Sequence, residues 1–168
     1  MQLRQRIPIV GWAVVLAFGC AVGVSSQAAS PLGGTWKINL AKSKYSPANL
    51  APKSSTTKID VSASGVHLTN DGVDSQGRAT HTEYTATFDG KDHPWKGTIE
   101  GKPSPDQDVI AWKKIDDRTF EVTNKLKGQV LTTQRTVVAQ DGKSRTSTVT
   151  GKNAQGQTVS HTVVYDKQ

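Results

Sequence analysis

Residues 31–47, PLGGTWKINLAKSKYSP, contain the pattern that decides the fold of this protein. Trp36, Ile38 and Leu40 alternate with polar residues along this stretch. Successive side chains of a strand point to opposite faces of a sheet, so the alternation predicts a strand with one apolar and one polar face. Strands of this kind are typical of an antiparallel sheet that buries only one of its faces.

The same period of two recurs along the rest of the chain, and no internal window has a convincing helical period. Turn-forming pairs such as Asp-Gly separate the alternating runs and provide the backbone angles that tight hairpins need. The expected turns are Asp71-Gly72, Asp89-Gly90, Lys127-Gly128, Asp141-Gly142 and residues 153–156. The pattern predicts about ten strands, near residues 35–40, 55–63, 65–70, 78–88, 94–99, 108–115, 118–126, 129–139, 144–151 and 157–166.

Most of the predicted connections are of hairpin length, which indicates an up-and-down meander. The exception is residues 41–55, which hold Pro47 and Pro52 and read as a loop with room for one short helical turn. A meander of about 8–10 strands usually removes its edges by closing into a barrel. We therefore predict an all-β, antiparallel up-and-down barrel, with a two-sheet β-sandwich as the alternative.

The first 28 residues, MQLRQRIPIVGWAVVLAFGCAVGVSSQA, have the layout of a secretory signal peptide. Arg4 and Arg6 precede a nearly unbroken apolar stretch, and small residues end the segment at Ala28. We expect this segment to be removed, which predicts export to the periplasm or the extracellular space. The alternative is an uncleaved membrane anchor, for which the apolar stretch is near the lower length limit.

Residues 29–168 are expected to form one domain, which is long enough to bury a core. Because Cys20 is the only cysteine, cleavage after Ala28 would leave this domain without disulfides and dependent on its core. A less favoured reading takes Cys20 as the acylated first residue of a lipoprotein, which would anchor the protein to a membrane.

The charge of the chain does not indicate a nucleic-acid surface. The formal net charge is +7, and the two arginines of the signal segment account for part of it. The remaining charges are scattered, whereas nucleic-acid binding proteins cluster basic residues on one face. We expect a monomer whose charged side chains are mostly solvated.

Both ends of the chain resemble members of the calycin group. The stretch GTWKINLAKSKY, residues 34–45, resembles the Gly-x-Trp first strand of lipocalins and the GTWK start of fatty-acid-binding proteins. Residues 132–168 resemble the last hairpins of fatty-acid-binding proteins, with an arginine-containing strand, an Asp-Gly turn and a closing Tyr-acid-Lys. The chain is also similar to small exported bacterial proteins with the same start and no settled role. The resemblance implies a calycin-type barrel with Trp36 as a structural plug at one end.

Two features depart from this pattern. Fatty-acid-binding proteins hold the ligand carboxylate with an Arg-x-Tyr on the last strand, where this chain has Val163 and Tyr165. They also carry a helical lid that residues 41–55 are too few to form, so a lipocalin-like open mouth fits better. Lipocalins stack an arginine on the Gly-x-Trp tryptophan, and Arg135 is the first candidate for that place, with Arg145 second.

The two arginines are expected to point to opposite sides of the sheet. A two-residue turn at Asp141-Gly142 would place Val138 opposite Arg145, and directly opposed residues share a face. Arg135 lies three positions before Val138 and would therefore face the other way. An inward guanidinium needs a carboxylate, a stack on Trp36 or an anionic ligand, because burying a bare charge is costly.

The predicted function is exported, noncatalytic binding of a small hydrophobic or amphipathic molecule in the barrel lumen. Core filling is the alternative for the aromatic candidates, and His161 shares its predicted face with Val159 and Val163. The ligand-binding candidates are Arg135, Trp95, Trp112, Tyr84, Phe88, His161 and Tyr165.

Two other functions remain open, a structural or interaction protein of the cell envelope with a filled core and a carbohydrate-binding sandwich. No catalytic residue, cofactor or metal site is predicted. His81 and Glu83 share a strand face, but a zinc site needs three or four ligands. The sequence contains no Gly-x-Ser-x-Gly elbow and no phosphate-binding or dinucleotide-binding fingerprint.

Overall fold

The computed structural model describes residues 29–168, so the expected signal peptide and Cys20 lie outside the described residues. One short 3-10 turn, η1 (Ala48–Leu50), interrupts the loop after the first strand as predicted, and no helix in the described part is long and apolar enough to cross a membrane. The strands are β1 (Gly34–Ile38), β2 (Lys44–Ser46), β3 (Ser54–Val61), β4 (Gly65–Val73), β5 (Ala79–Thr87), β6 (Asp89–Pro94), β7 (Lys96–Ile99), β8 (Lys102–Pro103), β9 (Val109–Lys114), β10 (Thr119–Leu126), β11 (Gln129–Val138), β12 (Ser144–Lys152) and β13 (Thr158–Lys167).

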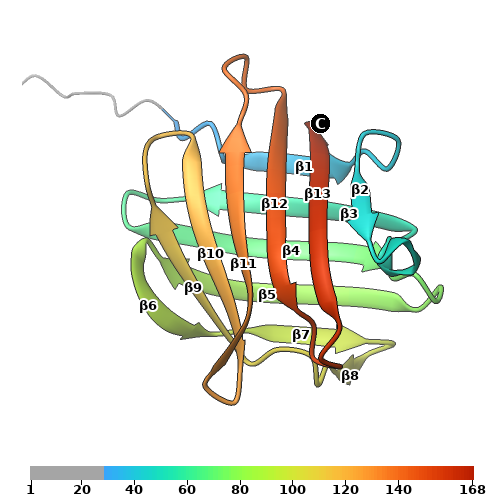
Figure 1. Ribbon diagram of the computed structural model, residues 1–168. Helices are drawn as coiled ribbons and strands as arrows, with labels where there is room; N and C mark the ends of the chain where they lie inside the picture. The colour runs from blue at the N-terminus through green and yellow to red at the C-terminus, as the bar shows by residue number, and fades with distance from the viewer. Residues whose placement is uncertain (1–28) are drawn as a thin grey trace, which may run out of the picture.

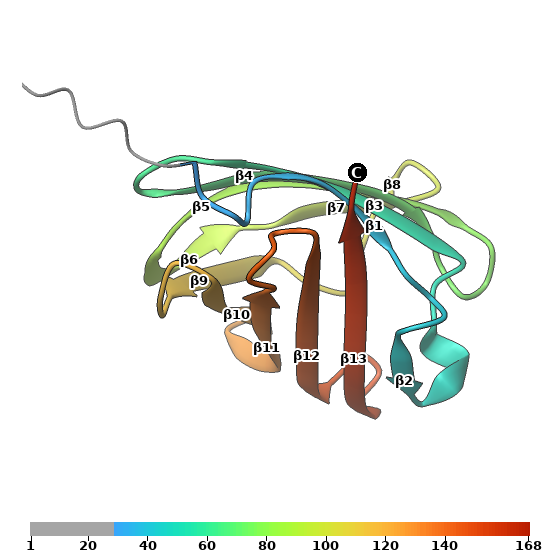
Figure 2. The ribbon, with the colours of Figure 1, turned by 90° about the horizontal axis from the view of Figure 1, so that it is seen from above.

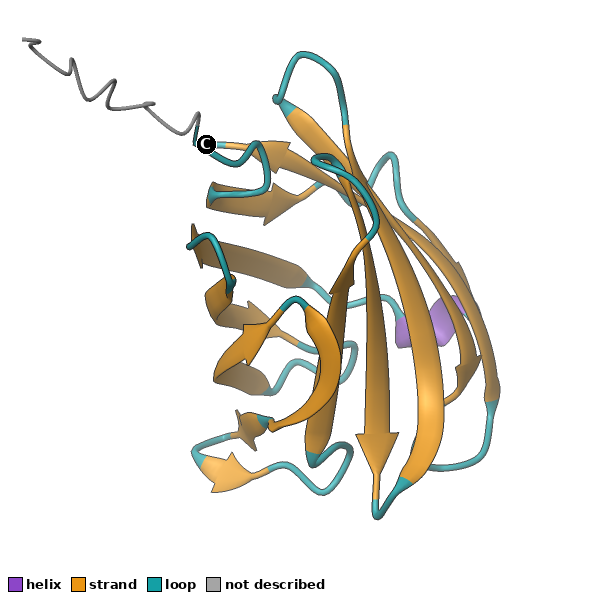
Figure 3. Cartoon of the chain, turned by 90° about the vertical axis from the view of Figure 1, so that its left-hand side faces the viewer, coloured by secondary structure: helices purple, strands orange, loops and turns teal. Residues whose placement is uncertain are grey.

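These strands form a single 13-stranded antiparallel sheet, with the order β6-β9-β10-β11-β12-β13-β1-β3-β4-β5-β7-β8 and β2 paired to β13. The sheet curls so that β1 and β3–β5 form one layer and β9–β13 cross it as the other (Figures 1 and 3). The prediction of an all-β antiparallel meander is therefore confirmed, and its form is a curled half-barrel. The two layers belong to one continuous sheet, so the alternative of two separate sheets is wrong.

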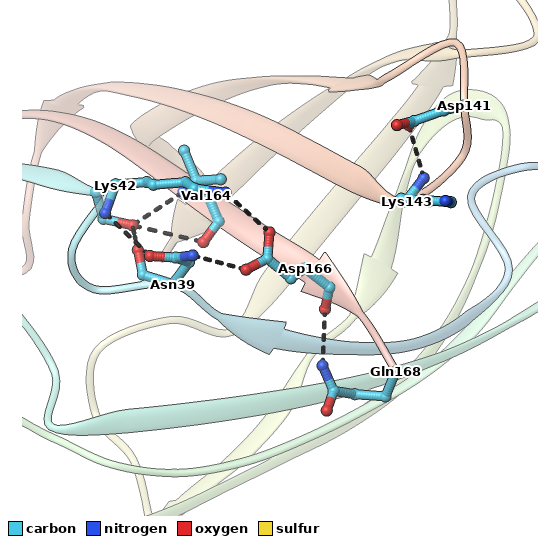
Figure 4. A network of polar contacts seen from close by, with 8 residues as sticks. Asn39, Lys42, Asp141, Lys143, Val164, Asp166 and Gln168 are labelled. Carbon is cyan, nitrogen blue, oxygen red and sulfur yellow. Dashed lines mark hydrogen bonds and ion pairs between the residues drawn. The ribbon is translucent and has the colours of Figure 1, made fainter.

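The first and last strands are neighbours, as Figure 2 shows from above. Strand β1 pairs with β13 on one side and with β3 on the other. Polar contacts near the end of β1 reinforce this junction (Figure 4). Asn39 donates a backbone hydrogen bond to Val164 O (2.8 Å) and a side-chain hydrogen bond to the carboxylate of Asp166 (2.6 Å), and Lys42 lies 3.7 Å from the same carboxylate. The N-terminal strand is thereby held to the C-terminal strand.

The chain crosses from one layer to the other where β5 runs into β6. Strand β7 pairs with the first half of β5, as far as Glu83 opposite Lys96. After Phe88 the chain leaves β5 and pairs as β6 with β9 instead. The His93 ring bridges the gap, because its Nε2 accepts a hydrogen bond from the Thr87 N–H (3.2 Å). The chain itself thus joins the two layers, although β5 and β6 share no backbone pairing.

Two of the predicted turns are wrong. Asp71-Gly72 lies inside β4 and Asp89-Gly90 inside β6. A Cβ at Gly72 would lie 2.6 Å from Ser54 O, so this glycine serves close strand packing and not a turn. Residues 74–78 make the actual β4–β5 turn, in which Asp74 accepts the N–H groups of Gln76 and Arg78. The other three predicted turns connect strands as expected. The structure has three short strands that were not predicted, β2, β6 and β8.

An apolar cluster fills part of the interior between the two layers. It includes Trp36, which is fully buried and donates a hydrogen bond from Nε1 to Leu32 O (2.8 Å). Phe120 is also fully buried, and Phe88 packs on it with ring centroids 5.5 Å apart. The buried members are Leu32, Trp36, Ile59, Val66, Leu68, Tyr84, Ala86, Ile110, Trp112, Phe120, Val122 and Val138. Some of these cluster members also line a cavity together with polar side chains, and the candidate site lies there.

Candidate functional site

The centre of the site is Arg145 on β12, which faces the interior of the half-barrel. The strand register places it opposite Val138 of β11 and Tyr165 of β13, as the Asp141-Gly142 turn predicted for Val138. Only 4% of its surface is exposed. The guanidinium carbon lies 4.0 Å from the ring centroid of Tyr165 and 5.5 Å from that of Trp36. Two aromatic rings therefore hold the cation by cation–π contacts.

Arg145 has no anionic partner within the described part of the chain. No carboxylate there lies within ion-pair distance of its guanidinium, and its buried Nε makes no hydrogen bond. Burial lowers the pKa of Arg145, and the neighbouring hydroxyls of Tyr165 and Tyr84 oppose that shift only in part. A buried guanidinium with unused N–H donors is an unfavourable arrangement unless something else supplies an acceptor.

A cavity of about 190 Å³ borders Arg145. Its wall combines aromatic rings with amide and hydroxyl side chains from strands of both layers. A cavity of this size accommodates a head group, since whole ligands of drug size occupy about 300–1,000 Å³. The lining residues are Ser55, Thr57, Leu68, Asn70, Thr82, Tyr84, Trp95, Ile110, Trp112, Val122, Asn124, Gln134, Arg145 and Tyr165.

A larger open cleft of about 860 Å³ forms the mouth of the half-barrel. It shares Thr82 and Trp95 with the inner cavity, so these two residues mark the boundary between cleft and cavity. The Trp95 ring lies over Gly97, where a Cβ would come within 2.0 Å of a ring carbon. Only glycine at that position allows the ring to lie there. The mouth includes the β4–β5 and β12–β13 turns, η1 and the loop after β8.

The expectation that Arg135 faces the interior is wrong. Arg135 lies on the outer face of β11 and is exposed, with Nη1 3.4 Å from the carboxylate of Glu121. Arg145 occupies the inward position instead. Part of the outer face of β11 is apolar, with Val137 42% exposed, whereas the interior face carries Gln134 and Thr136. The rule that apolar residues point inward therefore does not identify the inner face of this strand.

Four of the five aromatic candidates line the inner cavity, and two of these four, Tyr84 and Trp112, also belong to the apolar cluster. Tyr84, Trp95, Trp112 and Tyr165 line the inner cavity. Within it, Trp112 Nε1 donates a hydrogen bond to the Tyr84 hydroxyl (3.3 Å), and burial raises the pKa of Tyr84. Phe88 does not line this cavity, because it packs between Phe120 and Trp112 in the apolar cluster.

His161 lies apart from the inner cavity, beside Tyr45 of β2. The two rings are 4.9 Å apart, and His161 Nδ1 accepts a hydrogen bond from the Ser46 N–H (3.3 Å). Burial lowers the pKa of His161. The histidine therefore holds β2 against β13 and does not line the inner cavity. Among residues 29–168, no group of three or more possible ligands lies close enough to hold a metal ion.

We expect His161 to make stability depend on pH. Since its folded pKa lies below 6.5, the unfolded chain binds a proton more readily, and the free energy of unfolding falls as the pH drops below 6.5. The variant His161→Asn keeps an acceptor for the Ser46 N–H but does not titrate. Urea unfolding at pH 7.5 and 5.5 should show a smaller loss of stability on acidification in the variant than in the wild type. Equal losses would contradict this assignment.

Sequence reasoning missed the amides that face the cavity. Asn70, Asn124 and Gln134 come from β4, β10 and β11, and the register pairs them across the sheet with inward residues. A polar residue at every second position of a strand reads as a solvent-facing side, so the pattern concealed them. The strand register set by the Asp141-Gly142 turn could have revealed the inward amide, because it places Gln134 on the same face as Val138.

No protein-family model matches the chain. No curated protein matches it either. Among solved structures, the chain is similar to a zebrafish ileal bile acid-binding protein in complex with cholic acid, with a TM-score of 0.48 and 13% sequence identity over 83% of this chain and 100% of that one.

Proposed function

We propose that this protein is exported and binds a small amphipathic acid, without catalysis, in the interior of its half-barrel. The observation that carries the proposal is the buried, unpaired guanidinium of Arg145 at the wall of a cavity that adjoins an open mouth. A carboxylate is the natural partner of a guanidinium, because the two form short, paired, charge-assisted hydrogen bonds.

The geometry supports an acidic group placed deep, with the rest of the molecule directed outward. Trp36 and Tyr165 hold the guanidinium in place, so little ordering of this side chain is left for the binding step. Beyond the inner cavity, the body of the ligand would pass Trp95 into the mouth cleft. Tyr84 and Trp112 would contact the ligand from the side.

One observation favours a second function, a structural or interaction protein of the cell envelope. Large side chains, among them Tyr84, Trp112 and Tyr165, reduce the inner cavity to about 190 Å³. In that case Arg145 would serve only as a stacked part of the core. The two functions differ in whether an acid binds, and this difference is measurable.

The direct test is binding of acids against their neutral analogues by isothermal titration calorimetry and tryptophan fluorescence. Trp95 and Trp112 border the cavity, so an occupied lumen should change the emission. Native mass spectrometry of protein purified from its own host should in addition reveal a retained acid. Failure of every acid to bind better than its neutral analogue would reject the proposed function in favour of the structural alternative.

A further inference from the structure

We infer that the acid bound in this lumen is rich in hydroxyl groups, of the sugar-acid type exemplified by a hexuronate, either free or at the end of a glycan. This inference rests on the proposed function, because both place the carboxylate at Arg145. It goes further in assigning the chemistry of the remainder of the ligand, which the polar groups around Arg145 determine.

The wall beside Arg145 is apolar only in part, which disfavours a hydrocarbon tail. Asn70, Asn124 and Gln134 line the inner cavity together with Thr57 and Thr82. An alkyl chain packed on these groups would remove water from amides and hydroxyls without supplying hydrogen bonds. Each polar group that loses its water and gains no hydrogen bond weakens binding. A ligand that carries hydroxyl groups avoids this cost.

The amides keep hydrogen-bonding capacity of both kinds. Asn70 Oδ1 accepts hydrogen bonds from the hydroxyls of Ser55 (2.6 Å) and Thr57 (2.8 Å), while its amide N–H groups have no partner among residues 29–168. Gln134 Nε2 donates to Thr136 (2.9 Å) and Ser147 (3.2 Å), which leaves the Gln134 carbonyl as an acceptor. A hydroxyl group both donates and accepts, so it matches such a mixed set.

The mouth cleft continues this chemistry. Five amide side chains line it, from Asn49, Gln76, Gln107, Gln155 and Gln157. Two of its charged groups pair with each other, since Asp74 and Arg78 lie 2.7 Å apart, and the Asp106 carboxylate accepts a hydrogen bond from the neutral amide of Gln155 (3.1 Å). The part of the ligand beyond the acid is therefore expected to be polar but uncharged, as in a further sugar unit.

The dimensions agree with a ring. The inner cavity of about 190 Å³ corresponds to roughly six water molecules at the volume of liquid water, so it has room for one compact ring, with the rest of the ligand in the mouth cleft. Trp95 at the boundary and Tyr165 beside Arg145 offer apolar ring surfaces. A pyranose combines a hydroxyl edge with apolar C–H faces and can use both kinds of surface.

The test compares four probes by isothermal titration calorimetry: glucuronate, glucose, dodecanoate and a short oligomer of glucuronate. Glucuronate should bind at least about tenfold more tightly than glucose, which lacks the carboxylate. It should also bind more tightly than dodecanoate, which lacks the hydroxyl groups. Tighter binding of the monomer would assign the site to a free sugar acid, and tighter binding of the oligomer to a glycan end.

The variant Gln134→Met removes the amide at nearly constant volume. Thr136 and Ser147 remain satisfied, because their hydroxyls are 2.8 Å apart and bond to each other. Glucuronate binding should weaken by at least about tenfold, while dodecanoate binding should be unchanged or tighter. Gln129→Met is the matched control, since Gln129 is exposed at the start of the same strand.

The outcomes separate this inference from the proposed function. Dodecanoate binding that exceeds glucuronate binding, or a Gln134→Met variant with unaltered glucuronate affinity, would overturn the sugar-acid inference and leave acid binding at Arg145 intact. If no acid binds, both the sugar-acid inference and the proposed function are wrong. Preference for glucuronate that depends on Gln134 but not on Gln129 would establish the inference.

Discussion

Replacement of Arg145 by methionine is expected to abolish acid binding and to stabilise the unliganded protein. Methionine fills a similar volume without a charge. Since Arg145 is 4% exposed and has no carboxylate partner in residues 29–168, the wild type carries most of the desolvation cost of a buried ion. That cost amounts to several kcal/mol, and the contacts with Trp36 and Tyr165 return about 1–2 kcal/mol each.

The net effect of Arg145→Met should be a gain of about 1–2 kcal/mol in the free energy of unfolding, with a loss of at least about 100-fold in affinity for the acid. Urea unfolding gives the first quantity, and calorimetric titration gives the second. A gain in stability together with a loss of binding would show that the charge of Arg145 serves ligand binding and not folding.

Two further variants make this result specific. Arg145→Lys keeps the charge but not the planar fork, so the acid should bind weakly and the stability should not rise. Arg135→Met removes an exposed arginine of the neighbouring strand and should change neither quantity by more than about 1 kcal/mol. If Arg145→Met instead lowered stability by several kcal/mol and left acid binding unaltered, Arg145 would be a structural residue only.

Truncation of Trp36 to alanine should give the largest loss of stability in the chain, about 3–5 kcal/mol. The side chain is fully buried in the apolar cluster, and it donates a hydrogen bond to Leu32 O (2.8 Å). Its removal would leave a large cavity beside Arg145 and deprive the guanidinium of one of its two aromatic contacts. Because domains have only about 5–15 kcal/mol of stability, the variant should unfold at a much lower urea concentration.

Trp95→Ala is the matched control, since it truncates the same side chain at a half-buried position on the cavity boundary. Trp95→Ala should lose much less stability than Trp36→Ala, and its main effect should be on ligand binding. Equal losses for the two variants would show that Trp36 has no special role in holding the apolar cluster together.

The turns and the alternation were enough to predict several particular contacts. The Asp141-Gly142 turn placed Val138 opposite Arg145, and with it placed Arg135 and Arg145 on opposite faces, as the structure has them. The alternation around Trp36 predicted the first strand, although it does not show that β1 pairs with β13. Asp71-Gly72 misled the prediction, because the same residue pair serves a turn in one place and close strand packing in another.

The sequence by itself determined the all-β antiparallel meander, because period-two alternation and hairpin turns are local properties of the chain. Only the tertiary structure decided which face of β11 and β12 is inside. Curling the sheet brought polar faces such as Gln134 and Arg145 around a cavity, and left Val137 in solvent. An alternating strand specifies that its faces differ, but which of them is enclosed depends on strands from the opposite layer, far away in the chain.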